Sequence, residues 1–251
     1  MSEVFWLSET QFSRLEPLLP KDTRGKPRVD DQRVISGIVH VLASGGRWAD
    51  APPVYGPRKT LYNRFVRWAA KGVWRDAFEA LAAAGGPPAE LMLDSTHAKA
   101  HRCAAGGKGG PQAQAIGRSR GGRTTKIHAM VDGRGRPVAL AITAGQLGDA
   151  RAAIDLIAAV APSQSLAADT AYDSDAIRRF LIERGTIPVI PNNPTRKRHH
   201  PFDAQAYKRR NLIERMFCRL KDFRRVATRY DKLAANYAAT VHLAAIMIWW
   251  L

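Results

Sequence analysis

Apolar residues recur every three or four positions through the first 85 residues, and this spacing predicts a helical region. A first helix starts near Ser8, which forms a capping-box pattern with Gln11. A second helix begins near Asp31 and stops at the Gly45–Gly46 pair, because glycine favours the backbone conformation that ends helices. Its apolar face comprises Ile35, Ile38, Val39 and Leu42.

The third predicted helix runs from Gly56–Pro57 to Gly72 and has a basic outer face. Its inward positions are Leu61, Phe65 and Trp68, and its outward positions are Arg58, Lys59, Asn63, Arg64 and Arg67. Short helices in series, the last of them basic, are typical of a helix-turn-helix module that binds DNA. A plain helical bundle is the alternative interpretation.

After the GGPP segment at residues 85–88, short apolar runs replace the helical spacing. Strands are predicted at 91–94, 125–132, 137–143, 165–169 and 186–190, and helices at 150–161, 174–184 and 207–225. The Gly-rich segment from Ala104 to Gly122 is expected to be a mobile loop. This order predicts an α/β domain with a mixed sheet flanked by helices, over residues 87–251, preceded by a small all-α domain over residues 1–86.

The charge of the chain is concentrated in two stretches. The net charge is +17. From Lys99 to Lys126 there are seven Lys and Arg residues and no acid, and from Pro194 to Arg225 there are eleven against three acids. These stretches hold +15 of the excess, whereas an ordinary solvated basic surface would have it scattered. A nucleic acid is therefore the expected partner, because its phosphates release condensed counterions when cations neutralise them.

Neither a membrane nor a disulfide framework is expected. The first residues lack the basic and apolar regions of a signal peptide, and the longest apolar stretches are too short to span a bilayer. Cys103 and Cys218 lack metal-ligand spacing, so each is expected to be an ordinary thiol. These features predict a cytoplasmic protein.

Two acidic residues end strand-like runs. Asp94 follows LML, and Asp169 follows SLAA. The carboxyl-terminal edge of an α/β sheet is where binding sites generally lie. An Asp after a strand is also a common turn residue, so neither residue identifies a site by itself.

The basic stretch YKRRNLIERMFCRLKDFRR at 207–225 contains one glutamate near its middle, Glu214. On a helix of about 100° per residue, an arc of about 60° holds Tyr207, Arg210, Glu214, Lys221 and Arg225. The opposite side is an apolar stripe of Leu212, Ile213, Met216, Leu220 and Phe223. Glu214 could simply pair with Arg210, but such a pair contributes only a few tenths of a kcal/mol and explains neither Tyr207 nor Lys221.

Three carboxylates from two strand ends and a facing helix would suit a pair of divalent metal ions. Hard oxygen ligands favour Mg²⁺ or Mn²⁺. Two such ions about 3.5–4 Å apart support in-line phosphoryl transfer. The surrounding cations would hold the phosphate backbone of the substrate.

The spacing of Tyr207, Arg210, Glu214 and Lys221 resembles the Y-R-E-K signature of the DDE transposases of bacterial insertion sequences. LDST around Asp94, GRSRGGRTTKIHA at 117–129 and ADTAYDSD around Asp169 are similar to the rest of that family's core. The resemblance covers nearly the whole chain and is greatest to the IS-five type.

The resemblance implies an RNase H-like core with Asp94, Asp169 and Glu214 as the catalytic triad and the ligands of two divalent ions, Mg²⁺ or Mn²⁺ in its place. It implies cleavage of DNA at terminal inverted repeats, followed by attack of the freed 3′-hydroxyl on target DNA. It also implies a homodimer or larger synaptic assembly, in a bacterial cell and associated with the nucleoid. Arg210 and Lys221 would position phosphates, and the N-terminal helices would recognise the ends of the element.

Other polar residues have weaker assignments. DNA contacts are expected from Lys126 and from the helical residues Arg58, Lys59 and Arg64, together with Tyr207 and Arg225. Lys126 and His128 would face the metals or the DNA if their strand runs beside Asp94, although His128 could equally be structural. A metal role is not favoured for His97 or His101. Asp173 and Asp175 are expected to cap a helix, His199 and His200 to touch phosphate, and Trp249 and Trp250 to join the core.

Three other functions remain open on the sequence. A nuclease with the same core would cut DNA without joining strands. A regulator derived from a transposase would bind DNA without cutting it, and an RNA-processing enzyme would prefer RNA. Strand-transfer products, metal-dependent cleavage and substrate preference distinguish them.

Overall fold

The computed structural model describes residues 4–21, 28–107 and 109–251. Lys108, one of the basic residues counted above, lies outside them. The chain forms two compact units, each built from separate stretches of sequence. The first unit comprises residues 1–81, 100–114 and 220–251, and the second comprises residues 82–99 and 115–219. The expected boundary near residue 86 stays a prediction about which residues bind DNA and which are catalytic.

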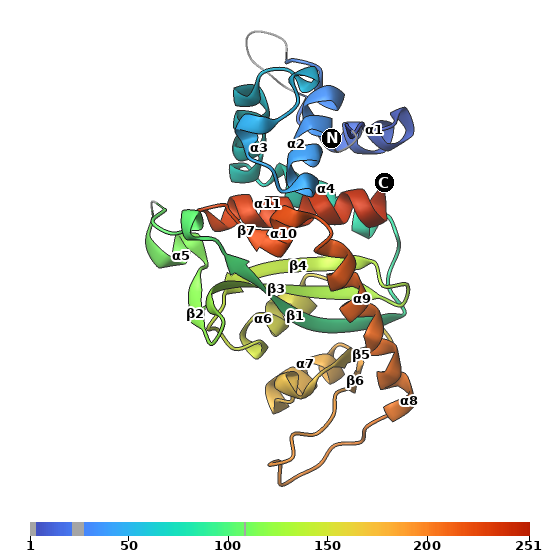
Figure 1. The fold of residues 1–251 in the computed structure, drawn as a ribbon. Coiled ribbons are helices and arrows are strands. Elements are labelled where there is room, and N and C mark those ends of the chain that lie inside the picture. Colours follow the sequence, from blue (N-terminus) through green and yellow to red (C-terminus); the bar gives the residue numbers. More distant parts are fainter. Residues whose placement is uncertain (1–3, 22–27, 108) are drawn as a thin grey trace. The chain divides into compact units, whose positions relative to one another are not determined.

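The N-terminal part of the first unit is helical, as predicted (Figure 1). Its helices are α1 (Glu9–Leu15), α2 (Asp31–Ser44), α3 (Arg58–Ala70) and α4 (Val73–Ala83), with short 3-10 helices at Glu16–Leu18, Trp48–Asp50 and Pro53–Tyr55. The capping box of Ser8 and Gln11 is present. Gly45 ends α2 with φ of +77°, a conformation that glycine adopts without strain.

The connection between α2 and α3 covers residues 45–57 and includes two of the 3-10 helices. This is longer than the turn of about three to four residues in a standard helix-turn-helix. Leu61, Phe65 and Trp68 are buried on α3, as predicted. Arg64 instead pairs with Asp31 at the start of α2, and its guanidinium lies 4.8 Å from the ring centre of Trp68.

The C-terminal helices complete the first unit. They are α10 (Arg224–Ala227) and α11 (Ala234–Ala245), followed by a π-helical turn (Ile246–Trp250), and α11 packs against α2 and α3. A 3-10 helix (Arg102–Ala104), α5 (Gly110–Gln114) and the short β7 (Thr228–Arg229) also belong to it. Trp250 is buried, as predicted, and Trp249 is partly buried. None of the helices in the described residues is long and apolar enough to span a membrane.

The second unit contains the predicted mixed sheet. Its strands are β1 (Glu90–Ala100), β2 (Gly117–Ser119), β3 (Gly122–Asp132), β4 (Pro137–Ala144), β5 (Ser165–Ala168) and β6 (Ile187–Val189). The main path is β4–β3–β1–β5–β6, antiparallel from β4 to β1 and parallel from β1 to β6. A long first strand between an antiparallel hairpin and two parallel strands is the RNase H-like arrangement.

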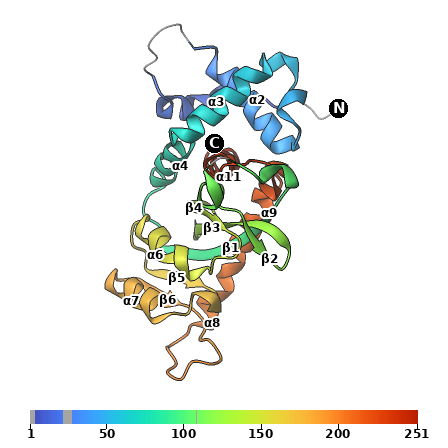
Figure 2. The same ribbon diagram turned by 90° about the vertical axis from the view of Figure 1, so that its left-hand side faces the viewer.

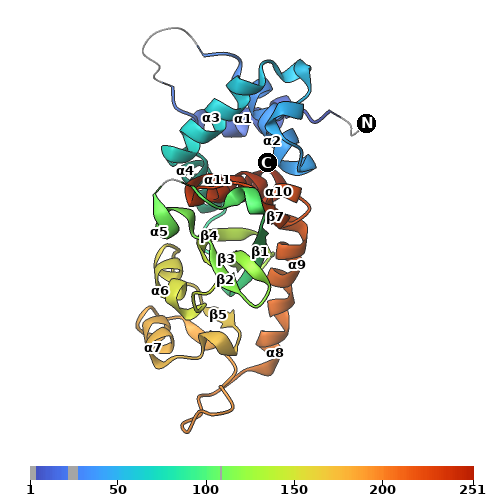
Figure 3. The same ribbon diagram turned by 60° about the vertical axis from the view of Figure 1, so that its left-hand side comes forward.

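Helices lie on both sides of this sheet. Figures 2 and 3 show α6 (Ala150–Ala158) and α7 (Asp175–Glu183) on one side and α9 (Asn211–Leu220) on the other. The core on the α6 and α7 side includes Leu91, Leu93, Met130, Leu156, Ile157, Leu166, Ile177 and Leu181. Leu91 and Leu93 therefore define one face of β1, and Asp94 belongs to the opposite face, because side chains alternate along a strand.

The predicted long helix over 207–225 is wrong. The chain forms α8 (Ala204–Tyr207), a 3-10 helix (Lys208–Arg210) and α9, then turns before α10. Asp203 caps α8 through the amides of Gln205 and Ala206. The turn after α9 allows Arg225 and Val226 to be buried in the first unit, where Arg225 donates a hydrogen bond to the Gly46 carbonyl.

The Gly-rich segment is more ordered than predicted. It contains α5 and β2, and β2 pairs with the start of β3. Thr125 in β3 donates a hydrogen bond from its hydroxyl to the Ala115 carbonyl, 2.8 Å away. Glycine and charge content predicted a loop here, but pairing with a neighbouring strand supplies order that composition does not reveal.

Candidate active site

Asp94 lies within β1 and Asp169 directly after β5. The predicted strand end at Asp94 is wrong, because pairing with β3 continues β1 to Ala100. Asp94 is on β1, and its Oδ1 accepts a hydrogen bond from the Ser95 amide at 2.8 Å. Asp169 directly follows β5, which runs parallel to β1, and its Oδ1 accepts from the Ala171 amide at 2.9 Å. Leu93 pairs with Ala168 in the parallel register of β1 and β5, so Asp94 and Asp169 lie at the same level, where β5 ends.

Glu214 comes to these two acids from α9, and Arg210 lies among the three carboxylates. One guanidinium nitrogen of Arg210, Nη2, is 2.7 Å from Asp94 Oδ2 and 3.9 Å from Asp169 Oδ2. Its other terminal nitrogen, Nη1, is 2.8 Å from Glu214 Oε1. The three acids selected from the sequence therefore converge on one cation.

The environment of these groups is uneven. The side chain of Arg210 is only 14% exposed, whereas that of Glu214 is 60% exposed. Burial raises the pKa of the Asp94 carboxyl, and Arg210 offsets only part of this rise. Burial alone would lower the pKa of Arg210, but the charge of Asp94 and the neighbouring acidic groups raises it overall. Three carboxylates and one guanidinium leave a net charge of −2, which favours binding of further cations.

Arg209 fixes the segment before α9 against the sheet. Its guanidinium pairs with Glu90 at the start of β1 and donates to the Gly133 carbonyl in the turn between β3 and β4. Leu212 lies against Gly135 in the same turn. The ion pair with Glu90 is half exposed and contributes little stability. Together, however, these contacts fix the position of residues 209–212 along the sheet, and so place Arg210 beside Asp94.

Lys126 and His128 lie on the opposite face of the sheet from Asp94. Their strand, β3, does run beside β1. In the register of the two strands, Lys126 is opposite His97 and His128 is opposite Ser95, so all four side chains lie on the face of the sheet opposite to Asp94. The prediction was that Lys126 would face the metals or the DNA if its strand ran beside Asp94. It is wrong, because the side chain lies on the other face of the sheet. Lys126 is buried and forms a 2.8 Å ion pair with Asp149.

Asp149, just before α6, belongs to no motif in the sequence, yet it is a centre of hydrogen bonding in the structure. Its Oδ1 accepts from Lys126 Nζ and, at 2.6 Å, from Ser95 Oγ. Ser95 therefore connects the two faces of the sheet: its hydroxyl donates to Asp149 on one face, and its amide donates to Asp94, whose side chain is on the other. In the sequence, an acid before a helix is typical of a helix cap. No neighbouring residue indicates that Asp149 instead binds Lys126 and Ser95.

The carboxylate oxygens of Asp94, Asp169 and Glu214 suit a hard divalent cation, although in this structure they contact the Arg210 guanidinium. Among the described residues, no three Asp, Glu, His or Cys side chains lie close enough together to hold a metal ion. The Arg210 guanidinium separates the three carboxylates. Their oxygens nevertheless form the all-oxygen set that Mg²⁺ and Mn²⁺ prefer, around a position that already holds positive charge.

The residues predicted to bind DNA fall into different environments. Tyr207 is partly buried in the second unit, and its ring centre is 5.9 Å from the Arg210 guanidinium carbon. Lys221 lies in the turn after α9, in the first unit. In the same unit, Arg58 and Lys59 are exposed in the first turn of α3.

Arg64 and Arg225 are exceptions, because their side chains are only 10% and 7% exposed and are engaged within the first unit. The prediction that they present exposed cations is wrong. Each guanidinium forms contacts with other residues of that unit instead.

His97 and His101 contact backbone groups. The Nε2 of His97 lies 3.3 Å from the Gly145 carbonyl oxygen, and the Nδ1 of His101 accepts from the Cys103 amide. Cys103 and Cys218 are both exposed, and neither forms a disulfide within the described residues.

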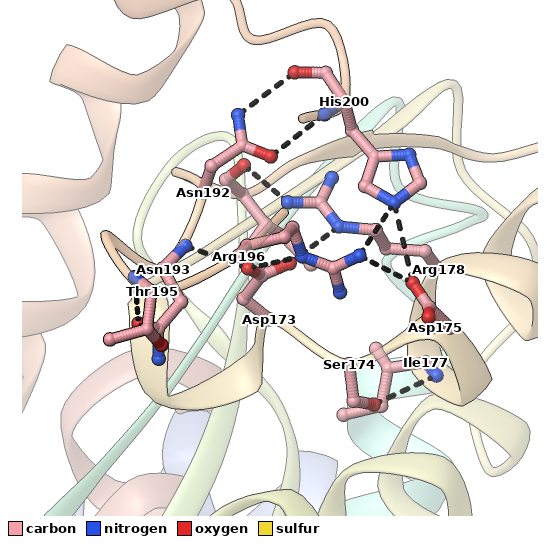
Figure 4. A network of polar contacts seen from close by, with 11 residues as sticks. Asp173, Ser174, Asp175, Ile177, Arg178, Asn192, Asn193, Thr195, Arg196 and His200 are labelled. Atoms are coloured by element: carbon pink, nitrogen blue, oxygen red, sulfur yellow. Dashed lines mark hydrogen bonds and ion pairs between the residues drawn. The ribbon is translucent and has the colours of Figure 1, made fainter. Parts of the chain in front are cut away.

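Asp173 has a different role from the predicted helix cap. Ser174 caps α7, whereas Asp173 is fully buried between two arginines (Figure 4). Its Oδ1 accepts from Arg178 Nε at 2.7 Å, and its Oδ2 accepts from Arg196 Nε at 2.9 Å and from the Asn193 amide at 2.7 Å.

The Asp173 network makes stability depend on pH. Burial alone would raise the pKa of Asp173, but the hydrogen bonds from Asn193, Arg178 and Arg196 hold it at about 2. A depressed carboxyl pKa stabilises the fold above the unfolded value of about 3.9, and this stabilisation is lost as pH falls toward 2. Replacing Asp173 by Asn should therefore cost less stability at pH 2 than at pH 6, by about 2 kcal/mol.

Urea unfolding followed by circular dichroism at pH 2, 3, 4 and 6 measures this difference. Asp155→Asn on the exposed side of α6 is the matched control, with an expected effect near zero throughout. A destabilisation by Asp173→Asn that stays constant with pH would contradict the assigned ion pairs.

Two family models match this chain. The model described as "Putative transposase of IS4/5 family" matches residues 7–78, and the model described as "Transposase DDE domain" matches residues 85–250. The second match includes every strand of the sheet and all three converging carboxylates. The first covers α1 to α3 and the beginning of α4.

Curated relatives agree with these matches. The "Putative transposase for insertion sequence element IS6501" of Brucella ovis is 39% identical over 127 residues, which is 50% of this chain and 98% of that protein. The "Putative transposase for insertion sequence element IS402" of Burkholderia cepacia is 31% identical over 137 residues, 50% of this chain and 63% of that protein. The fold, the converging carboxylates and these matches together lead to one conclusion: the chain belongs to the DDE transposase family.

Proposed function

We propose that this enzyme is the transposase of an insertion sequence, which cuts DNA at the terminal inverted repeats and joins the freed ends to target DNA. The observation that carries the proposal is the convergence of Asp94, Asp169 and Glu214 on Arg210 beside the central strand of an RNase H-like sheet. A structural ion pair would need one carboxylate for one guanidinium, and this site has three.

Asp94, Asp169 and Glu214 are the residues that would hold two divalent ions, Mg²⁺ or Mn²⁺. Bound ions would supply Lewis-acid activation of the attacking oxygen and stabilisation of the leaving oxygen. Arg210 would then exchange its carboxylate contacts for the phosphate beside the scissile bond. Tyr207, partly buried beside Arg210, would hold that guanidinium in place through its ring.

DNA recognition is proposed for the basic residues of both units. Arg58 and Lys59 in the first turn of α3 are exposed, which supports contact with the ends of the element. Residues 1–86 would thus bind the ends, and residues 87–251 would cut and join them, with Lys221 contributing a phosphate contact. Two ends must be held together for joining, so a dimer or larger assembly working at the bacterial nucleoid is part of the proposal.

The test uses the full chain and DNA that carries its gene with the native flanks. We expect breaks at paired inverted repeats that expose 3′-hydroxyls, dependent on Mg²⁺ or Mn²⁺, and joined products with a target plasmid. Mapping the breaks at nucleotide resolution, with EDTA as the control, measures this. Breaks without joining would replace the proposal with a nuclease, and binding without breaks would replace it with a regulator.

A further inference from the structure

The segment between β6 and α8 forms a closed loop with a fixed shape. Asn192 and His200 close its base, because the Asn192 side chain donates to the His200 carbonyl at 2.9 Å and accepts from the His200 amide at 2.8 Å. Inside the loop, Asn193 Oδ1 accepts from both the amide and the hydroxyl of Thr195. The side chains of Asn192 and Asn193 thus hold the two sides of the loop together through hydrogen bonds to backbone groups and to Thr195.

Ion pairs of Arg196 hold the middle of the loop, one with the buried Asp173 and one with the exposed Asp175. Arg196 reaches Asp173 through Nε at 2.9 Å and Asp175 through Nη1 at 2.6 Å (Figure 4). Behind Asp173, the buried Arg178 donates from Nη2 to the Ile190 carbonyl at 2.8 Å, where the loop begins. The backbone on both sides of residue 197 is therefore restrained from within the second unit.

The tip of the loop has the opposite character. Lys197, Arg198 and His199 are exposed, and they form no hydrogen bond or ion pair with any residue that the structure describes. No acid occurs between Asp175 and Asp203 except Glu183 on α7. Asp173 and Asp175 thus fix the middle of the loop through Arg196, and no acid of this stretch neutralises the tip.

The loop is attached to both segments that carry the candidate active site. Asp173 lies one short 3-10 helix (Thr170–Tyr172) after Asp169. On its other side, the loop leads through α8 to Tyr207 and Arg210. Any DNA strand held at the carboxylates continues past them as a line of phosphates, spaced about 3.4 Å apart along each strand.

We infer that residues 192–200 form a preshaped loop that binds the phosphate backbone of the substrate DNA through Lys197, Arg198 and His199. This inference rests on the proposed function for the identity of its partner. The contact is independent of base sequence, because it consists of two cations and a histidine on a loop tip and no element that enters a groove. The loop thus adds phosphate contacts beside the cleaved strand. These residues are not part of the family signature, which runs from Tyr207 to Lys221.

The test removes two tip cations without touching the network that shapes the loop. In Lys197→Ala/Arg198→Ala, the slope of log Kobs against log salt for a duplex should decrease in magnitude by roughly 1.8, since each lost phosphate contact contributes about 0.9. The loss should be equal for DNA with and without the inverted repeat. Binding is measured by fluorescence anisotropy between about 50 and 300 mM salt, in EDTA, so that cleavage plays no part.

The matched control is Arg151→Ala/Arg179→Ala, which removes two exposed cations from α6 and α7, on the other side of the sheet from α9. The inference holds if the slope changes in the loop variant and not in the control. An unchanged slope in the loop variant, or an equal change in both, overturns it. Wild-type cleavage assayed in parallel separates the two proposals: a changed slope without cleavage defeats only the transposase function, and cleavage with an unchanged slope defeats only the loop.

Discussion

Glu214→Gln should abolish metal-dependent DNA cleavage, with a fall of at least about 10³-fold, while the fold stays intact. The amide has nearly the shape of the carboxylate but no charge, so it is a poor ligand for a hard divalent ion. Transition-state stabilisation by a metal ion is worth several kcal/mol, and every 1.36 kcal/mol is tenfold in rate. The loss of the exposed pair with Arg210 should change stability by less than about 1 kcal/mol.

Single-turnover cleavage of an inverted-repeat substrate in Mg²⁺ measures the effect, and thermal unfolding checks the fold. Glu183→Gln, an exposed glutamate on α7, is the matched control and should cut like the wild type. Cleavage by Glu214→Gln within about tenfold of the wild-type rate, which is about 1.4 kcal/mol, would remove Glu214 from the active site.

The site's carboxylates could be predicted because each follows from local sequence. Asp94 and Asp169 each end an apolar run, and parallel pairing of β1 with β5 brings such ends together. The i, i+4 spacing of Arg210 and Glu214 also survives, because one turn of helix joins them whatever happens further along. The capping box of Ser8 and Gln11 was predicted correctly for the same reason: a few neighbouring residues determine it.

Features that depend on distant parts of the chain could not be predicted. The helical wheel placed Arg225 in line with Glu214, but burial of Arg225 against Gly46 requires the chain to turn after α9. Lys126 was expected near Asp94, whereas the register of β3 on β1 points it to the other face. A one-residue change in register would reverse that outcome, and no property of the strand's own sequence reveals it.

The two polar networks illustrate the same limit. Asp149 and Ser95 are 54 residues apart, and Asp173 and Arg196 are 23 apart. In the sequence, Asp173 looked like a helix cap and Arg196 like one more cation in a basic stretch. Only the folded second unit shows that Arg196 forms an ion pair with Asp173, whereas Lys197 and Arg198 of the same loop are exposed.

Arg210→Ala should change metal binding and cleavage in opposite directions. In the absence of DNA, the Arg210 guanidinium occupies the position between the carboxylates that a cation would take. Its removal lowers the local charge from −2 to −3. At an effective dielectric constant of about 20, one unit charge about 5 Å from a divalent ion contributes several kcal/mol before screening, so Mn²⁺ should bind at least about tenfold more tightly. Cleavage should fall by about 10²-fold, because the substrate phosphate loses its positively charged partner.

Calorimetric titration of DNA-free protein with Mn²⁺ near pH 8 measures the first effect, and single-turnover cleavage in saturating Mn²⁺ measures the second. Arg215→Ala, an exposed arginine on α9, is the matched control and should change neither. Arg210→Ala should also lower the thermal stability of the metal-free protein, because the partly buried Asp94 loses its partner, and Mn²⁺ should restore it. Unchanged Mn²⁺ affinity in a folded variant would show that the guanidinium and the metal do not compete, and the three carboxylates would then form a structural cluster around Arg210.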